Sequence, residues 1–333
     1  MLAFLAAIVC GGGGGSRAAT LTTDAANSVC LFRLTGRIER DDVAAIRSRL
    51  TPLDALDTDD TDDNKDRQIC LDSPGGNFGA ALDIGTYLFE QSYGTVVEEG
   101  ASCLSACAVI FMFGNVHGEE FAGFRRKLHI RGRLGFHAVS PVLPPGPYPS
   151  EAVPDLVRAA FAQSSQVAGM IVEAVRRTPG LGAEPMMRDS LVVRMLTTDP
   201  SRLFMVETVD QFGRWHVDPL GLTMTVRIGR NELVQACRNA LVWTRDGDAA
   251  LLTDEVSSVE TRPVSGNAEA PLESTVALVG FAELGCRIRH AATIANGALV
   301  EIETNDEFTG VKRLIFANIL YFLPPDTLMR NLR

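Results

Sequence analysis

A serine stands between two cysteines in residues 100–114, GASCLSACAVIFMFG, just before an almost entirely apolar run. Ser105 is a candidate nucleophile. A hydroxyl at a helix start lies beside backbone N–H groups without partners and beside the positive end of the helix dipole. The N–H of Ala106 is therefore a candidate donor to an oxyanion. The alternative is that Ser105 is only a small residue that lets a buried helix pack closely.

A second donor to the same oxygen is offered by a glycine-rich turn, LDSPGGN at residues 71–77. Gly75 and Gly76 have no side chains, so a substrate carbonyl can approach the backbone N–H of Gly76 closely. Two N–H groups that converge on one oxygen are what stabilises a tetrahedral intermediate. We therefore expect the N–H groups of Gly76 and Ala106 to form an oxyanion hole.

A serine is a weak nucleophile at its own pKa and needs a general base. Of the five histidines, His137 is the best candidate, because RLGFH at residues 133–137 puts it at the end of a predicted strand, facing a loop. A single histidine on such a strand is more often structural, so this assignment depends on the pairing with Ser105. The other four are less favourably placed: His117, His129, His216 and His290.

The elements that must position these residues alternate between strand and helix. Apolar runs predict strands within residues 28–38, 67–72, 94–100 and 125–139, and helical spacing predicts helices within 39–50 and 77–94 and after Ser105. Such alternation is typical of right-handed β-α-β units with a largely parallel sheet. The predicted fold class is α/β.

The pattern changes in the later part of the chain. A proline-rich loop leads into a long amphipathic helix that we expect to be interrupted at Pro154, and a second helix is predicted over Glu184–Leu196. After Gly221, four short runs predict strands: LTMTVRIG, NALVWTRD, STVALVGF and ALVEIETN. We divide the chain into residues 1–19, an export leader with a glycine-rich tether, residues 28–220, the α/β domain, and residues 221–333, a smaller β-rich accessory domain.

Composition excludes one class of partner. The chain has 333 residues and a net charge of -10, which provides no basic surface for nucleic acid. Seven aspartates against one lysine give residues 54–66 a local charge of -6. We interpret this segment as a solvated loop, since a calcium loop would need the glycine and terminal glutamate that it lacks.

The first ten residues, MLAFLAAIVC, are about as long as the core of an export signal, although no positive charge precedes them. Cleavage near Ala18 and Ala19 would fit such a signal. Cys10, followed by glycine, looks like a lipoprotein acylation site that would tether the protein to a membrane, but Val9 stands where that pattern needs a small residue. A short apolar helix without a targeting role is the remaining alternative. We expect an exported protein of the periplasm or cell envelope.

Seven cysteines are present, and six remain if Cys10 belongs to the leader. An even number fits disulfides formed in an oxidising compartment, and Cys237 with Cys286 is the most natural pair. Cys103 and Cys107 could form a bridge if Cys103 lies in a turn; otherwise both are small buried residues. No paired C-x-x-C spacing occurs, so neither a metal nor another cofactor is predicted.

Three segments in order resemble Clp-type serine peptidases of the Clp/crotonase superfold, and more closely the exported bacterial proteins of that fold. They are SPGG at residues 73–76, ASCLSACAVIF around Ser105, and RLGFH ending at His137. Over residues 28–220 the resemblance implies a Clp/crotonase-like β-β-α superhelical domain with Ser105 as nucleophile and His137 as base. It further implies an oxyanion hole at the N–H groups of Gly76 and Ala106.

The third catalytic residue implied by the resemblance is Asp199, which precedes Phe204 with an offset that differs by about one residue from the family pattern. Asp210 is the substitute, unless it only caps a helix start. A Ser/Lys dyad is less favoured, because the only lysines are Lys65, Lys127 and Lys312.

The expected function is that of an exported serine hydrolase, a peptidase that cleaves peptide or protein substrates through an acyl-enzyme. One alternative is a non-catalytic binding or envelope protein that keeps the fold. Another is a crotonase-like acyl-CoA enzyme that uses carboxylates in place of Ser105, although export argues against an intracellular cofactor. Rings and trimers are usual in the superfold, so self-association into a homo-oligomer is expected by analogy.

Overall fold

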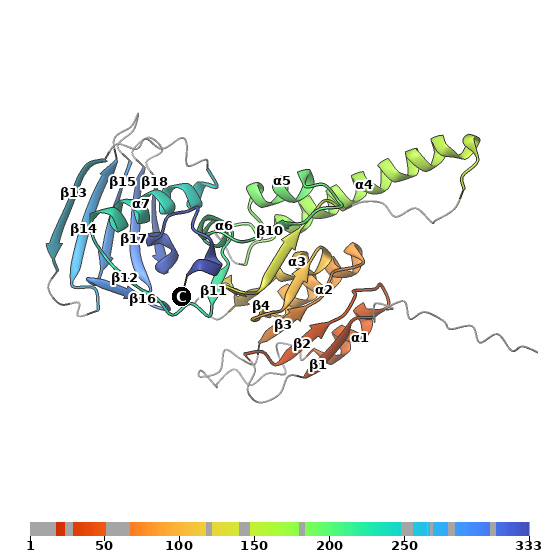
Figure 1. The fold of residues 1–333 in the computed structure, drawn as a ribbon, viewed down its shortest axis with the longest axis horizontal. Coiled ribbons are helices and arrows are strands. Elements are labelled where there is room, and N and C mark those ends of the chain that lie inside the picture. The colour runs from red at the N-terminus through yellow and green to blue at the C-terminus, as the bar shows by residue number, and fades with distance from the viewer. Residues whose placement is uncertain are drawn as a thin grey trace, which may run out of the picture.

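The computed structural model describes residues 18–23, 29–50, 67–117, 122–139, 147–179, 184–247, 256–264, 266, 269–278, 284–306 and 311–332. Two features singled out in the sequence lie outside these residues: residues 1–17 of the expected leader, with Cys10, and the acidic segment 54–66, with Lys65. Figure 1 shows a mixed sheet with its helices at the N-terminal end of the chain and a second, antiparallel sheet at the C-terminal end.

Six strands form the N-terminal sheet, in the order β1-β2-β3-β4-β8-β11. Their bounds are β1 (Thr20–Thr23), β2 (Phe32–Thr35), β3 (Gln68–Asp72), β4 (Gly94–Val97), β8 (Arg126–His129) and β11 (Asp218–Leu220). β1 is antiparallel to β2, and every later pair in the sheet is parallel. α1 (Asp42–Arg49) and α2 (Phe78–Glu90) connect successive parallel strands. The predicted α/β class is confirmed.

Burial explains why the central strands read as continuous apolar runs. All four residues of β4 and the first four of β3 are buried, because the strands of a parallel sheet are covered on both faces. Asn77 is the N-cap of α2, and its side chain accepts a hydrogen bond from the Ala80 N–H at 2.8 Å. The SPGG turn is thereby fixed between the end of β3 and a capped helix start.

A smaller sheet of three strands, next to the N-terminal sheet in the chain, has the order β10-β9-β5. It contains β5 (Ser102–Leu104), β9 (Arg133–Phe136) and β10 (Phe204–Met205), and an isolated bridge from Ser73 to Cys103 joins β5 to the end of β3. α3 (Ala106–Phe111) follows β5 with one intervening residue, Ser105, and all six of its residues are buried. The expected extended run at residues 125–139 is thus two strands, β8 and β9, in different sheets. β6 (Asn115–His117) and β7 (Ala122–Phe124) pair separately.

The helices after β9 differ in two ways from expectation. α4 (Val153–Val175) is not interrupted at Pro154, which is its second residue; the first turn tolerates a proline because its N–H would have no acceptor there. α5 (Asp189–Thr197) begins five residues later than predicted, since Pro185 disfavours helical backbone at Glu184. α4 projects away from both sheets (Figure 1).

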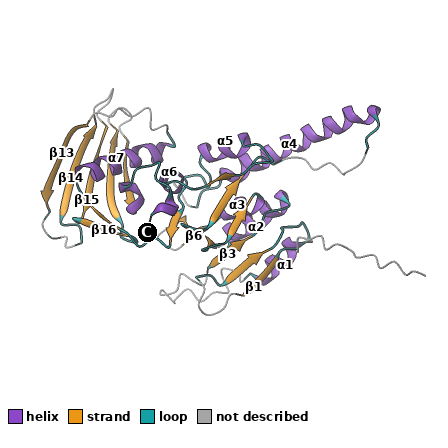
Figure 2. Cartoon of the chain, in the orientation of Figure 1, coloured by secondary structure: helices purple, strands orange, loops and turns teal. Residues whose placement is uncertain are grey.

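The C-terminal part consists of sheets and one long helix. An antiparallel sheet has the order β13-β14-β15-β17-β18, a two-stranded sheet pairs β12 with β16, and α7 packs on the larger sheet (Figure 2). The bounds are β12 (Thr225–Arg227), α7 (Arg230–Arg245), β13 (Val256–Pro263), β14 (Leu272–Leu278), β15 (Leu284–His290), β16 (Thr293–Ala295), β17 (Val300–Asp306) and β18 (Val311–Ala317). The prediction that NALVWTRD is a strand is wrong: it is the second half of α7, whose buried residues recur at helical spacing.

Three disulfides link the described cysteines: Cys30–Cys70, Cys103–Cys107 and Cys237–Cys286. The predicted pairing of Cys237 with Cys286 is confirmed, and it joins α7 to β15. The alternative of a bridge around Ser105 is also the one observed, because Cys103 lies in β5 and not in the helix. None of the helices in the described ranges is long and apolar enough to cross a membrane.

Candidate active site

Ser105 occupies the junction between β5 and α3 with backbone angles of φ 57° and ψ -123°. Its N–H donates to the carbonyl of Gly135 at 2.8 Å, and its carbonyl accepts from the N–H of Ala108 at 3.0 Å. A side chain in such a backbone region costs about 1–3 kcal/mol, and this kind of strain clusters at functional sites. A serine that only fills space at a helix start does not require this conformation.

The SPGG turn packs directly against this junction. At Gly75, φ is 94°, and a Cβ atom would lie 2.8 Å from the Cβ of Ser105 and 2.5 Å from the carbonyl oxygen of Leu104. At Gly76, φ is 149°, and a Cβ atom would collide with the backbone of Ile38. Backbone hydrogen bonds from the Ile38 N–H to Gly75 and from the Asn77 N–H to Ile38 hold the turn in place. Only glycine fits at either position.

The two N–H groups predicted as oxyanion donors lie at this contact. Among the described residues, neither the N–H of Gly76 nor that of Ala106 has a hydrogen-bond acceptor. Gly76 directly follows Gly75, and the nitrogen of Ala106 would be 2.9 Å from a Cβ atom at Gly75. Two donors without acceptors therefore flank one glycine beside the serine.

His137 follows β9, and β9 pairs with β5 in parallel, with Leu104 opposite Gly135. The adjoining ends of two neighbouring strands thus carry His137 and Ser105. The Nδ1 atom of His137 lies 2.8 Å from the carbonyl oxygen of Ala138. Because a carbonyl only accepts, this contact requires the proton on Nδ1, and in the neutral tautomer that fits it the lone pair lies on Nε2, as a general base needs.

The structure does not join the two side chains by a hydrogen bond. Within the described part of the chain, neither Ser105 Oγ nor His137 Nε2 has a hydrogen-bond partner. Catalytic hydrogen bonds are often long without substrate and shorten in the complex with it. The pair is therefore placed on adjacent strand ends but is not yet bonded.

The backbone next to Asp199 lies beside the segment of His137, but the Asp199 carboxylate does not form a hydrogen bond with the imidazole. The carbonyl of Thr198 accepts from the N–H of Ala138 at 3.1 Å, which brings this segment alongside. The Asp199 carboxylate, however, is exposed and accepts hydrogen bonds from the hydroxyl and the N–H of Ser201 at 2.7 and 2.8 Å. These bonds hold the pKa of Asp199 below its usual value. The Ala138 carbonyl, and not Asp199, fixes the tautomer of His137.

The substitute carboxylate, Asp210, has a structural environment. It lies in the first turn of α6 (Val209–Arg214), forms an ion pair with Arg214 at 2.7 Å, and accepts from the Trp243 indole N–H at 2.8 Å. The indole belongs to α7, so Asp210 links the α/β part of the chain to the C-terminal part.

Two further serine–histidine pairs had no signal in the sequence. Ser274 Oγ lies 2.8 Å from His290 Nε2, and Ser92 Oγ lies 2.8 Å from His117 Nδ1. Ser274 and His290 are brought together by strand register, and both are almost completely buried, as is Ser92. A substrate cannot reach these hydroxyls, so both pairs are structural.

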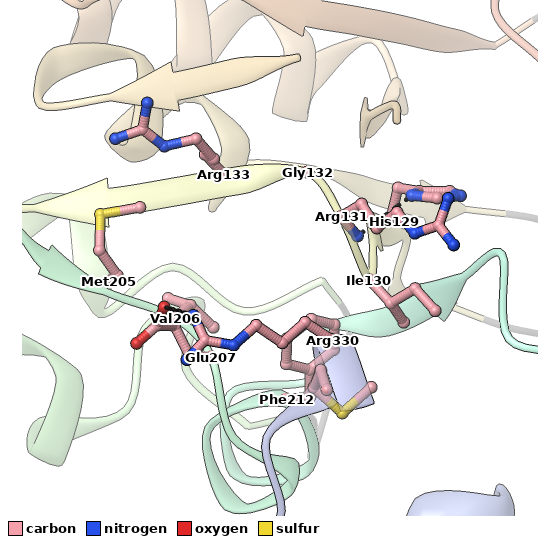
Figure 3. A pocket seen from close by; sticks show the side chains of 11 residues that line it. His129, Ile130, Arg131, Gly132, Arg133, Met205, Val206, Glu207, Phe212 and Arg330 are labelled. Atoms are coloured by element: carbon pink, nitrogen blue, oxygen red, sulfur yellow. Dashed lines mark hydrogen bonds and ion pairs between the residues drawn. The ribbon is translucent and has the colours of Figure 1, made fainter. Parts of the chain in front are cut away.

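A cavity of about 290 Å³ lies beside the start of β9 (Figure 3). Its walls are the turn that carries Arg131, strand β10 with Met205, and Arg330 near the end of the chain, which forms an ion pair with Glu207. The Met205 sulfur packs so closely on Gly135 that a Cβ atom there would lie 2.7 Å from it. The cavity does not contain Ser105, but it shares the strand β9 with the site.

In the ranges that the structure describes, no group of three or more histidine, cysteine, aspartate or glutamate side chains could hold a metal ion. Of the lysines considered for a dyad, Lys127 lies in β8 and Lys312 in β18, where it pairs with Glu303 at 3.7 Å.

A scan against protein-family models finds no match to the chain, and a search of curated proteins finds no matching sequence.

Proposed function

We propose that this protein is an exported serine hydrolase with a Clp/crotonase-like fold that cleaves peptide or protein substrates. The observation that carries the proposal is the backbone of Ser105, held at φ 57° on a strand-to-helix turn against Gly75. A sharp strained turn of this kind presents a serine hydroxyl at the end of a sheet in other hydrolases. The free Nε2 lone pair of His137 on the adjacent strand end supports it.

The chemistry would proceed in two halves. His137 Nε2 takes the proton of Ser105 as its oxygen attacks the substrate carbonyl, and the N–H groups of Gly76 and Ala106 donate to the oxyanion. The imidazolium then gives its proton to the leaving amine, which leaves an acyl-enzyme. Next, His137 deprotonates a water molecule that attacks the ester, and the proton returns to Ser105 as the acid departs. The Ala138 carbonyl would hold the Nδ1 proton throughout.

Localisation and family are part of the same proposal. Three disulfides are typical of proteins that fold in an oxidising compartment, which supports the periplasm or cell envelope. Fractionation of cells that express the chain with and without residues 1–19 tests this. The parallel β-α-β units and the SPGG turn beside Ser105 support the resemblance to Clp-type peptidases.

A fluorophosphonate probe, which reacts only with activated serines, tests the catalytic assignment. We expect the wild-type protein to be labelled, and Ser105→Ala and His137→Ala to be unlabelled although folded. Ser102→Ala, three residues earlier in β5, and His129→Ala are matched controls that should keep the label. If the folded wild-type protein is not labelled, the hydrolase proposal is wrong.

The second candidate is a non-catalytic binding protein on the same fold. The observation that favours it is the missing hydrogen bond between Ser105 and His137, together with the engagement of Asp199 by Ser201. The same labelling experiment separates the two candidates, because a binding protein would leave the probe unreacted.

A further inference from the structure

The disulfide between Cys103 and Cys107 encloses Ser105, and one residue separates the serine from each cysteine. Cys103 belongs to β5 and Cys107 is the second residue of α3, and both are completely buried. Their Cα atoms are 5.1 Å apart, whereas an extended chain of that length would span about 13 Å. The bridge therefore permits only a tightly turned backbone at Ser105.

We propose that this disulfide is a positioning element for the nucleophile, and that the hydrolase is fully active only while the bridge is intact. The inference rests on the proposed catalytic role of Ser105. Cys103 and Cys107 do not touch the substrate; they act through the backbone that carries the Ser105 hydroxyl and the Ala106 N–H.

The strand side of the junction is fixed without the bridge. The Leu104 N–H donates to the carbonyl of Ser73 at 3.0 Å, and the N–H of Ser105 donates to Gly135. Cys103 itself pairs with Leu134 across β5 and β9. These contacts locate the last strand residues but end at the nitrogen of Ser105.

Among the described residues, the first turn of α3 has no comparable backbone hydrogen bond to a neighbouring strand. α3 has only six residues, and a helix this short has little stability of its own. The first contact beyond Ser105, from the Ala108 N–H to the Ser105 carbonyl, is local and would move with the helix. Without the bridge, Ser105 can relax toward negative φ. This rotation would turn the Ala106 N–H away from Gly76, and with it one of the two oxyanion donors.

The chemistry that opens the bridge is a thiol–disulfide exchange. A dithiol supplies two electrons and two protons, Cys103 and Cys107 become thiols, and the dithiol is oxidised to its own disulfide. Because both sulfurs are buried, the exchange requires local opening of the segment and is expected to be slow. A substitution is therefore the cleaner test.

The test compares Cys103→Ala/Cys107→Ala with Cys237→Ala/Cys286→Ala, which removes a bridge from the C-terminal sheet. Loss of one oxyanion donor typically lowers kcat by about 100- to 1000-fold. With the activated ester p-nitrophenyl acetate as substrate, we expect the first variant to lose at least about tenfold in kcat with KM within about threefold, and the second to keep its kcat. We also expect faster amide hydrogen exchange over residues 104–108 in the first variant alone. Unchanged kcat or unchanged exchange overturns the proposal.

The exchange measurement separates this proposal from the function on which it rests. If the wild-type protein is not labelled at Ser105, the hydrolase proposal fails, while the exchange of residues 104–108 still decides whether the bridge holds the turn. If the double variant does not fold, the wild-type chain treated with dithiothreitol replaces it, with mass spectrometry to count the thiols. Labelling must then fall as Cys103 and Cys107 are reduced and return on reoxidation; full labelling of protein reduced at this bridge overturns the proposal.

Discussion

The positive φ of Ser105 leads to a stability prediction that does not depend on catalysis. Glycine adopts φ 57° and ψ -123° without the clash that a Cβ atom creates, so Ser105→Gly should relieve strain that Ser105→Ala retains. The relief is worth about 1–3 kcal/mol. Glycine also lowers the free energy of unfolding by about 0.5–1 kcal/mol relative to alanine, because the unfolded chain is more flexible at a glycine. The free energy of unfolding of Ser105→Gly should thus exceed that of Ser105→Ala by roughly 1 kcal/mol.

Denaturant unfolding of the two oxidised variants measures this difference. The matched control is Ala45→Gly, at an exposed position within α1 where the backbone is helical. There glycine should cost about 1 kcal/mol relative to alanine. The two glycine-for-alanine comparisons should therefore have opposite signs. If glycine at position 105 is less stable than alanine by as much as at position 45, Ser105 is not held at positive φ, and the argument for a strained nucleophile fails.

Three further predictions follow from contacts of single residues. Gly75→Ala places a methyl group 2.5 Å from the Leu104 carbonyl, and a shift of the neighbouring serine by about 1 Å should slow labelling by about 100-fold, measured as the rate of reaction with the probe. Asp199→Asn should change that rate by no more than about threefold, because Ser201 holds the carboxylate; a loss near 10,000-fold would show that Asp199 orients His137 instead. Burial lowers the pKa of His290, so its contribution to stability is complete above about pH 6.5 and is lost as the pH falls. Unfolding at pH 7.5 and 5.5 should show a smaller loss for His290→Gln than for the wild-type protein; equal losses would contradict this.

The alternation of strands and helices could be predicted from the sequence because each element buries a run of apolar residues with its own period. The close approach of the glycine-rich turn to Ser105 agrees with the predicted site, because each of the two segments has a distinctive local composition. The strand predicted at residues 239–246 is wrong because the prediction used only this short fragment. Once α7 is seen whole, its apolar residues follow a period of 3.6, but the fragment alone resembles a strand.

Side-chain direction is what the sequence could not provide. Asp199 was expected beside His137, and the backbone does bring the two segments together, through the hydrogen bond from Ala138 to Thr198. A carboxylate one residue before a proline and two before Ser201 accepts the local hydrogen bonds of the turn in preference to a distant imidazole. Competition of this kind depends on differences in hydrogen-bond geometry that spacing does not encode.

The contacts behind Ser105 extend to the end of the chain. The N–H of Ser105 donates to β9, and the Val206 N–H, just after β10, donates to the carbonyl of Leu134 in β9 at 2.9 Å. Glu207 in turn accepts from the N–H of Met329 at 2.8 Å, in the short helix η5 (Met329–Asn331). Since each link is a backbone hydrogen bond, it restrains its neighbour whatever side chains are present. Residues near the end of the chain thus brace the strand that accepts the hydrogen bond from Ser105, and a chain cut after residue 220 would lack this support.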